Sequence, residues 1–316
     1  MIRLEAVSKV WADGTVAVDG LTLDVAEGEV CVLVGPSGSG KTTTMRLINR
    51  MVEPTSGRIA VDGRDVSTVD VSTLRRGIGY VIQQIGLFPH QTVGANIATV
   101  PRLLGWPRAR VAERVDELLT LVGLSPSVFR DRYPHQLSGG QRQRVGVARA
   151  LGADPPVLLM DEPFGAIDPV QRVRLQDEFR ALQSLLRKTV VFVTHDIDEA
   201  VRLGDRIAVL GEGGVLAQVG TPSEVLGSPA DEFVSGFVGS ERGLRRLRVL
   251  SVSVSDLIAA PPGWEGRTIP LSSSLEDALA ALLLDDAPSI GVVDASGVVL
   301  GVLTPAAVHA AARRRQ

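Results

Sequence analysis

This chain is poor in the features that mark secreted, nucleic-acid-binding and membrane-spanning proteins. A single cysteine, Cys31, stands among 316 residues, which excludes a disulfide framework and favours a reducing compartment. The 33 basic and 36 acidic side chains give a formal net charge of -3, so we expect no nucleic-acid partner. No charge-free apolar run approaches the ~20 residues that span a bilayer, and residues 1–10 do not resemble a signal peptide. We therefore expect a cytoplasmic chain that reaches a membrane only through a partner.

Lysine is also scarce, and arginine supplies 30 of the 33 basic side chains. Hydrophobic residues nonetheless make up 45 % of the chain, enough for a packed core, which excludes a disordered or fibrous protein. The length of 316 residues favours two domains, or one large domain with an appendage. A change in sequence character near residue 240 predicts a first domain over 1–240 and a second over 241–316.

Apolar periodicity predicts an α/β fold for the first of these domains. Residues 1–30 alternate apolar and polar positions around the turn signals Asp13-Gly14 and Asp19-Gly20, which indicates antiparallel strands. Residues from about 88 to 150 have helical spacing and indicate a mostly helical insertion. From residue 157 onward short apolar strands alternate with helices, a pattern typical of a parallel sheet covered by helices.

A glycine-rich loop follows the apolar strand expected over 29–34 and precedes a helix expected over 41–52. Its sequence matches the phosphate-binding pattern G-x-x-x-x-G-K-[ST] in the context that this pattern requires. Glycines let backbone N–H groups converge on phosphate oxygens, and the N-terminus of the following helix favours the same anion. Lys41 should reach the β- and γ-phosphates, and the Thr42 hydroxyl should bind Mg²⁺. The candidate nucleotide-binding residues of the loop are Gly35, Pro36, Ser37, Gly38, Ser39, Gly40, Lys41, Thr42 and Thr43.

Two consecutive carboxylates follow the buried strand expected over Val157–Met160. Asp161 is placed to hold the Mg²⁺ shell, and Glu162 is placed to orient and deprotonate the attacking water. The alternative is an ordinary strand that ends in an acidic turn. A phosphate-binding loop in the same chain favours the functional interpretation, in which ATP and Mg²⁺ are the cofactors.

Further motifs occur in the order found in ATP-binding-cassette (ABC) proteins. Leu137–Gln141 resembles the signature sequence of that family, Gln83 its Q-loop glutamine, Gly165–Asp168 its D-loop and His195 its switch histidine. The resemblance covers about residues 1–240. It implies an α/β P-loop NTPase fold with a parallel core sheet, an antiparallel β subdomain and a helical subdomain.

The same resemblance implies an ATPase that works as a homodimer, with the two copies head to tail. The signature segment of one copy would cap the γ-phosphate that Lys41 of the other copy holds, and hydrolysis would let the copies part. Trp11 would stack on adenine, with an ordinary core role as the alternative. The residues implied for catalysis are Glu162, His195 and Gln83, and those for Mg²⁺ are Thr42, Gln83 and Asp161. The other nucleotide contacts implied are Ser138, Gly139, Gly140, Gln141 and Asp168.

Residues Gln83–His90 resemble the loop that receives a coupling helix from the membrane subunit of ABC importers. The longer phrase Ile78–His90 is similar to the ATP-binding subunits of osmoprotectant importers, which take up glycine betaine, choline or carnitine. This resemblance implies an integral membrane permease, a solute-binding protein and a location at the cytoplasmic face of the plasma (inner) membrane. Phe88 is either a docking contact or a core residue of the helical subdomain.

Two other functions stay open on the sequence alone. An importer ATPase of the same mechanism can serve another small polar solute, such as an amino acid, because no residue of this chain need touch the solute. The other is a soluble ABC ATPase that acts on nucleic acid, and the near-neutral charge argues against it.

The C-terminal domain resembles a cystathionine-β-synthase-type (CBS) module. Leu275–Leu284 has the pattern of a helix, followed by strands over Ser289–Asp294 and Gly297–Thr304 and by a second helix. Such modules normally work in pairs, and this domain has room for about one. Thr304–Ala307 stands where the ribose-binding pattern of that family places an aspartate. We therefore expect a linker and a single CBS-like module with a regulatory or dimerisation role, and a nucleotide-sensing module is the alternative.

Overall fold

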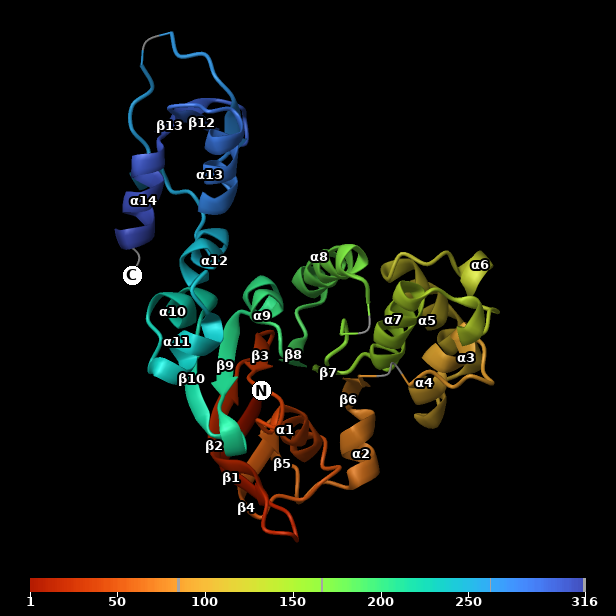
Figure 1. Cartoon of the computed structure of the whole chain (residues 1–316). Coiled ribbons are helices and arrows are strands. Elements are labelled where there is room, and N and C mark those ends of the chain that lie inside the picture. Colours follow the sequence, from red (N-terminus) through yellow and green to blue (C-terminus); the bar gives the residue numbers. More distant parts are fainter. Residues whose placement is uncertain (84–85, 166, 262, 315–316) are drawn as a thin grey trace. The chain divides into compact units, whose positions relative to one another are not determined.

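The computed structural model describes residues 1–83, 86–165, 167–261 and 263–314. The chain forms two compact units, Met1–Val219 and Gly220–Gln316 (Figure 1). No helix in the described ranges is long and apolar enough to cross a bilayer. The nucleotide-binding motifs predicted from the sequence all lie in the first unit, so the architecture of that unit determines the site.

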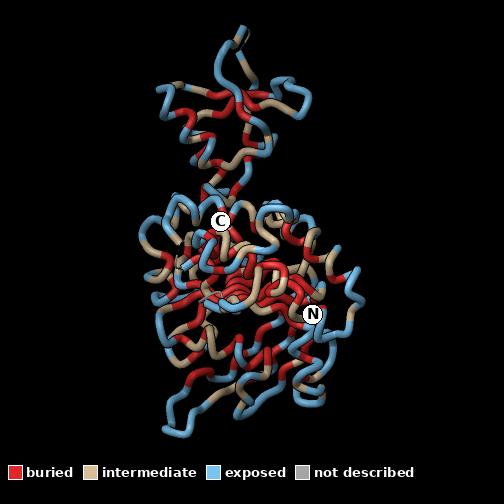
Figure 2. The backbone as a smooth tube through the Cα atoms, turned by 90° about the vertical axis from the view of Figure 1, so that its right-hand side faces the viewer, coloured by how far each residue is buried: buried red, intermediate tan, exposed pale blue. Residues whose placement is uncertain are grey.

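A six-stranded sheet forms the centre of the first unit. Its strands, in spatial order, are β10 (Leu216–Gly220), β9 (Arg206–Leu210), β3 (Val30–Val34), β8 (Thr189–Val193), β7 (Val157–Asp161) and β6 (Ile78–Val81). β3 pairs in parallel with β8 and β9, and β7 pairs in parallel with β6 and β8. β3, β7 and β8 are buried along their whole length, as the buried centre of this unit in Figure 2 shows. Because the carboxyl ends of parallel strands share one edge, the loops that follow β3, β7 and β8 lie together.

A separate antiparallel sheet contains, in spatial order, β2 (Val16–Val25), β1 (Ile2–Val10), β4 (Ser56–Val61) and β5 (Arg64–Asp65). The turn expected at Asp13-Gly14 joins β1 to β2. The turn expected at Asp19-Gly20 is wrong, because both residues lie inside β2. The pairing of β1 with β2 shifts register near this point, and Gly20 takes a φ of 56°. The glycine that suggested a turn therefore accommodates a β-bulge.

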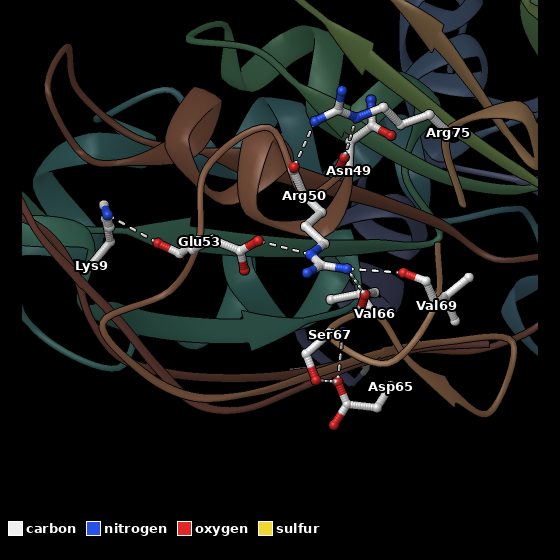
Figure 3. A network of polar contacts seen from close by, with 9 residues as sticks. All are labelled: Lys9, Asn49, Arg50, Glu53, Asp65, Val66, Ser67, Val69 and Arg75. Carbon is white, nitrogen blue, oxygen red and sulfur yellow. Dashed lines mark hydrogen bonds and ion pairs between the residues drawn. The ribbon is translucent and has the colours of Figure 1, made fainter. Parts of the chain in front are cut away.

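α1 (Lys41–Ile48) follows the phosphate loop. It ends at Ile48, whereas the sequence predicted a helix that continues to residue 52. Arg50 takes a φ of 48°, a left-handed conformation that stops the helix. Its guanidinium donates to the backbone oxygen of Val66 at 3.0 Å, and Arg75 donates to the Arg50 oxygen at 2.7 Å (Figure 3). Contacts with a later segment therefore set the end of α1, which helical spacing in the sequence does not reveal.

The described residues between β6 and β7 form helices and the loops that join them, where the sequence predicts a helical insertion. These helices are α3 (Val93–Ile97), α4 (Thr99–Leu103), α5 (Arg108–Leu121), α6 (Pro126–Phe129), a 3₁₀ turn at Pro134–Gln136 and α7 (Gly139–Ala150). The other helices of the unit are α2 (Val71–Arg76), α8 (Pro169–Leu186) and α9 (Ile197–Leu203), and a 3₁₀ turn spans Glu212–Gly214. Phe179 of α8 packs on Phe192 of β8 with ring centroids 6.2 Å apart, which fixes α8 to the sheet.

The second unit begins with the helices α10 (Pro222–Gly227), α11 (Glu232–Val238) and α12 (Arg242–Val249), and a 3₁₀ turn follows at Val254–Asp256. A three-stranded sheet follows, with β11 (Thr268–Pro270) beside β12 (Ile290–Val293) and β12 beside β13 (Val299–Leu303). α13 (Leu275–Leu284) and α14 (Pro305–Arg314) complete the unit. The predicted order of helix, strand, strand and helix from Leu275 onward is present.

The boundary expected at residue 240 lies inside the second unit, because α10 packs against α12. Residues 242–249, which the sequence assigned to a linker, form a helix in which Arg246 and Leu247 are buried. Leu247 belongs to the hydrophobic core of this unit together with Leu275 and Val292. The arginine-rich helix α12 is therefore part of the packed second unit. Its packing depends on residues that are distant in the sequence.

Candidate active site

The phosphate loop lies between β3 and α1, and three glycines give it a backbone shape that other residues rarely adopt. Gly35, Gly38 and Gly40 have φ values of 152°, 84° and 76°. A Cβ atom on Gly35 would lie 2.1 Å from the Leu210 oxygen, and one on Gly40 would lie 2.1 Å from the Ala17 oxygen. Both positions therefore require glycine. Sequence reasoning missed these two carbonyl neighbours, because nothing local in the loop indicates them.

Lys41 lies at the centre of this loop. Its Nζ donates to the Gly35 oxygen at 2.9 Å, the Pro36 oxygen at 2.7 Å and Ser39 Oγ at 3.1 Å. Burial lowers the pKa of Lys41, while two nearby carboxylates act in the opposite direction. An ammonium held by loop oxygens can exchange some of them for phosphate oxygens, as the predicted role requires. The other predicted loop residues lie at its exposed tip (Ser37, Gly38) or half-buried at the start of α1 (Thr42, Thr43).

Thr42 and Asp161 meet at the carboxyl edge of the parallel sheet. The Thr42 hydroxyl donates to Asp161 Oδ1 at 3.0 Å. Burial raises the pKa of Asp161, and the hydrogen bond from Thr42 opposes this effect. A hydroxyl and a carboxylate are hard oxygen donors of the kind that Mg²⁺ binds alongside phosphate oxygens and water. Among the described residues, no group of three or more His, Cys, Asp or Glu side chains could hold a metal ion. Binding of Mg²⁺ by Thr42 and Asp161 stays a prediction.

Glu162 contacts the other two residues predicted for catalysis. The Gln83 amide donates to Glu162 Oε2 at 3.1 Å, and His195 Nδ1 lies 3.2 Å from Glu162 Oε1. Glu162 has a φ of 43°, a conformation that costs ~1–3 kcal/mol in a non-glycine residue and is concentrated at functional sites. The side chain of Glu162 is 22 % exposed and that of His195 is 61 % exposed, so solvent reaches the carboxylate. The cluster can hold and deprotonate a water molecule. The additional role of Gln83 as a Mg²⁺ ligand stays a prediction.

The signature and D-loop residues make no hydrogen bond to the phosphate loop within the described part of the chain. Ser138 Oγ caps α7 by accepting from the Gln141 N–H at 3.3 Å, and the Gln141 side chain accepts from the Ser138 N–H at 3.0 Å. Asp168 caps α8 by accepting from the Gln171 N–H at 3.0 Å. Ser138, Gly139 and Asp168 are exposed, and Gly140 is buried. Ser138, Gly139 and Asp168 are therefore accessible at the surface of a single chain, and their contact with a nucleotide stays a prediction.

Trp11 lies in the loop between β1 and β2 and is 38 % exposed. Lys9 Nζ lies 5.0 Å from the centroid of its ring, within range of a cation–π contact. A ring this exposed does not fit the core role that the sequence left open. Stacking of Trp11 on adenine stays a prediction.

The described residues of the segment expected to meet a membrane subunit are exposed or half-buried. Phe88 is 40 % exposed, so its role as a core residue of the helical subdomain is not supported. His90 is exposed as well and packs on Phe88 with ring centroids 6.0 Å apart. Gln84 and Ile85 of this segment, and Ala166 of the expected D-loop, lie outside the described residues.

Comparison with known proteins agrees with this geometry. The family model described as ABC transporter matches residues 18–165. The glycine betaine/carnitine/choline transport ATP-binding protein OpuCA of Bacillus subtilis is 51 % identical over 301 residues, which cover 95 % of this chain and 77 % of that protein. This chain belongs to the ABC transporter ATP-binding proteins. The glycine betaine uptake system ATP-binding protein YehX of Escherichia coli is 49 % identical over 96 % of this chain and 97 % of that protein.

A solved structure of a dimeric ATP-binding cassette in a post-hydrolysis state, bound to ADP and Pi, matches this ABC protein with a TM-score of 0.61. The two are 34 % identical, and the match covers 70 % of this chain and 98 % of that one. The predicted P-loop ABC ATPase fold is confirmed. This ABC ATPase binds and hydrolyses ATP. That the phosphate loop holds the nucleotide and that the cluster around Glu162 supports hydrolysis stay predictions.

Two substitutions should separate nucleotide binding from hydrolysis. Lys41→Ala removes the ammonium of the loop and should weaken ATP binding itself. Glu162→Gln keeps the size of the side chain and one of its two acceptor oxygens but removes the base, so it should bind ATP within about threefold of the wild type and hydrolyse it at least ~10²-fold more slowly. Fluorescence titration and phosphate release measure the two effects. Lys188→Ala, a lysine that pairs with Asp154 instead of lining the loop, is the control. Near-normal turnover of Glu162→Gln would contradict the assignment of the base.

Proposed function

We propose that this chain is the ATP-hydrolysing subunit of an importer for a quaternary-amine osmoprotectant such as glycine betaine, choline or carnitine. The similarity to OpuCA and YehX carries the proposal, since the names of both proteins state cargo of this class. Each alignment covers at least 95 % of the chain, so it extends through the second unit as well as the ATPase core. A soluble ABC ATPase that acts on nucleic acid has no comparable support.

In this function the chain supplies the base and the groups that orient it. Glu162 accepts the proton of the water that attacks the γ-phosphate, while Gln83 and His195 hold the two carboxylate oxygens in place. Mg²⁺ bound with ATP would neutralise charge on the β- and γ-phosphates, and Thr42 and Asp161 are the residues that fit it. The buried ammonium of Lys41 stabilises the same phosphates.

Two copies of the chain would enclose the nucleotides. Ser138 and Gly139 are exposed at the N-terminus of α7, a twelve-residue helix whose first N–H groups can bind an anion. In the proposed head-to-tail homodimer they cap the γ-phosphate held by Lys41 of the other copy, with Asp168 at the same interface. The dimeric form of the similar solved cassette supports this arrangement.

Residues 83–90 would transmit the conformational change between the ATPase site and a permease in the membrane. This segment begins at Gln83, which contacts the catalytic Glu162, and continues to the exposed Phe88 and His90. A shift of the segment on docking would therefore reach the carboxylate directly. The proposal places the chain at the cytoplasmic face of the plasma (inner) membrane, where ATP is available, with a solute-binding protein as a further component of the complex.

Uptake by the reconstituted complex tests the proposed cargo. We expect ATP-dependent uptake of labelled glycine betaine, choline or carnitine, and the Glu162→Gln complex should lose it. A labelled amino acid serves as the competing cargo. Uptake of the amino acid without any of the three amines would overturn the osmoprotectant assignment and leave the ATPase assignment intact.

We also propose that residues 241–316 contain a single CBS-like module that promotes dimerisation. Its helix α13 ends in two apolar side chains that the unit does not cover, Leu283 at 72 % and Leu284 at 78 % exposure. Adjacent exposed leucines of this kind favour burial against another surface. Because a cassette dimer would bring two such modules together, the second copy is present at high effective concentration.

Leu284→Asp should weaken dimerisation of the full chain at least about tenfold, because it places a charge in the proposed contact. Sedimentation of the nucleotide-free chain measures the effect. Leu244→Asp, at an exposed leucine of α12, is the matched control. Equal dimer affinity of the two variants would contradict the proposal. Calorimetric binding of AMP by the Lys41→Ala chain would favour the nucleotide-sensing alternative.

A further inference from the structure

Contacts of the adjacent residues in the chain fix the position of His195 more than contacts of its own imidazole do. Its imidazole is 61 % exposed, and its contact with Glu162 is the one hydrogen bond or ion pair that the described residues give it. Thr194 on one side is buried, and its hydroxyl accepts from the Asp196 N–H at 3.0 Å. Asp196 on the other side caps α9 by accepting from the Asp198 N–H at 2.8 Å. The orientation of the imidazole therefore depends on what holds residues 194 and 196.

α8 packs against α9 (Figure 1). Two side chains of α8, one helical turn apart, contact residues of the His195 loop and of α9. Arg172 Nη1 lies 3.9 Å from Asp196 Oδ2. Gln176 Nε2 donates to Glu199 Oε1 at 3.0 Å, and both residues are buried. Burial raises the pKa of Glu199, and Thr194 and Gln176 beside its carboxylate oppose this effect. α8 thus contacts the segment that follows His195, at Asp196 and at Glu199.

The same arginine also reaches the D-loop. Arg172 Nη2 donates to the Ile167 oxygen at 3.2 Å, directly before Asp168. Since α8 begins at Pro169, the guanidinium bridges the loop that enters the helix and the loop that carries His195. A planar guanidinium with several donors suits such a double contact better than an ammonium does.

We propose that Arg172 is a positioning residue that couples the D-loop to His195. The proposal rests on the proposed ATPase dimer, in which Asp168 faces the other copy and His195 faces the γ-phosphate. A shift at the dimer interface would then move the His195 loop through Arg172, so hydrolysis would respond to dimer closure. A purely structural role in anchoring α8 would instead change stability without a specific effect on turnover.

A double-mutant cycle on the full-length chain separates these roles. Arg172→Met removes the bridge but keeps an unbranched side chain. Asp196→Asn keeps an oxygen to cap α9 and removes the charge that faces Arg172. Arg180→Ala, at an exposed arginine on the same helix, is the control. ATP turnover, KM for ATP and the thermal unfolding temperature are measured for each variant.

We expect each single variant to lower kcat by about tenfold, with KM within about twofold, and the double variant to be no slower than the slower single. The control should match the wild type. Losses that multiply in the double variant, or an unchanged kcat, would overturn the proposal. If Arg172→Met does not fold, Asp196→Asn alone decides, since its cap is retained. A wild-type chain that hydrolyses no ATP would instead overturn the proposed function.

Discussion

The 3.0 Å hydrogen bond from Thr42 to Asp161 joins the start of α1, directly after the phosphate loop, to the end of the strand that precedes Glu162, the predicted base, and the predicted site is arranged around this bond. β3 and β7 are not neighbours in the sheet, because β8 lies between them. The hydrogen bond connects the segment after β3 to the end of β7 at the carboxyl edge of the sheet. Glu162, next in the chain, is then held in a left-handed conformation at the same edge, within reach of Gln83 and His195. The residue predicted to bind Mg²⁺ with the nucleotide and the residue predicted to remove the proton are therefore consecutive in the chain.

The sequence predicts those parts of the site that local patterns encode. The phosphate loop and the strand before Asp161 each consist of a few adjacent residues whose chemistry is specific. Features that depend on contacts between segments distant in the sequence cannot be predicted from such local patterns. The bulge at Asp19-Gly20 looks like a turn, because glycine accommodates both. Neither the end of α1 nor the packing of α12 is visible in apolar spacing, since distant residues determine both.

The exposure of the predicted residues divides them into two groups with different physical roles. Lys41 and Asp161 are buried, so their interactions with charged groups are strong and weakly screened. Ser138 and Asp168 are exposed at helix N-termini and have their local caps satisfied. Within one chain these residues cap helices, and their predicted contact with a nucleotide requires a second surface. In the proposed dimer that surface is a second copy, and Arg172 links the arriving surface to His195.

The central claim is that one nucleotide site contains Lys41 of one copy and Ser138 of the other. Mixing two inactive variants, Lys41→Ala and Ser138→Arg, tests it most directly. Each homodimer carries one defect in both of its sites, whereas a mixed dimer carries both defects in one site and none in the other. We predict that ATPase activity returns on mixing and grows with the fraction of mixed dimers. A mixture that stays as inactive as its two components, although mixed dimers form, would contradict the claim.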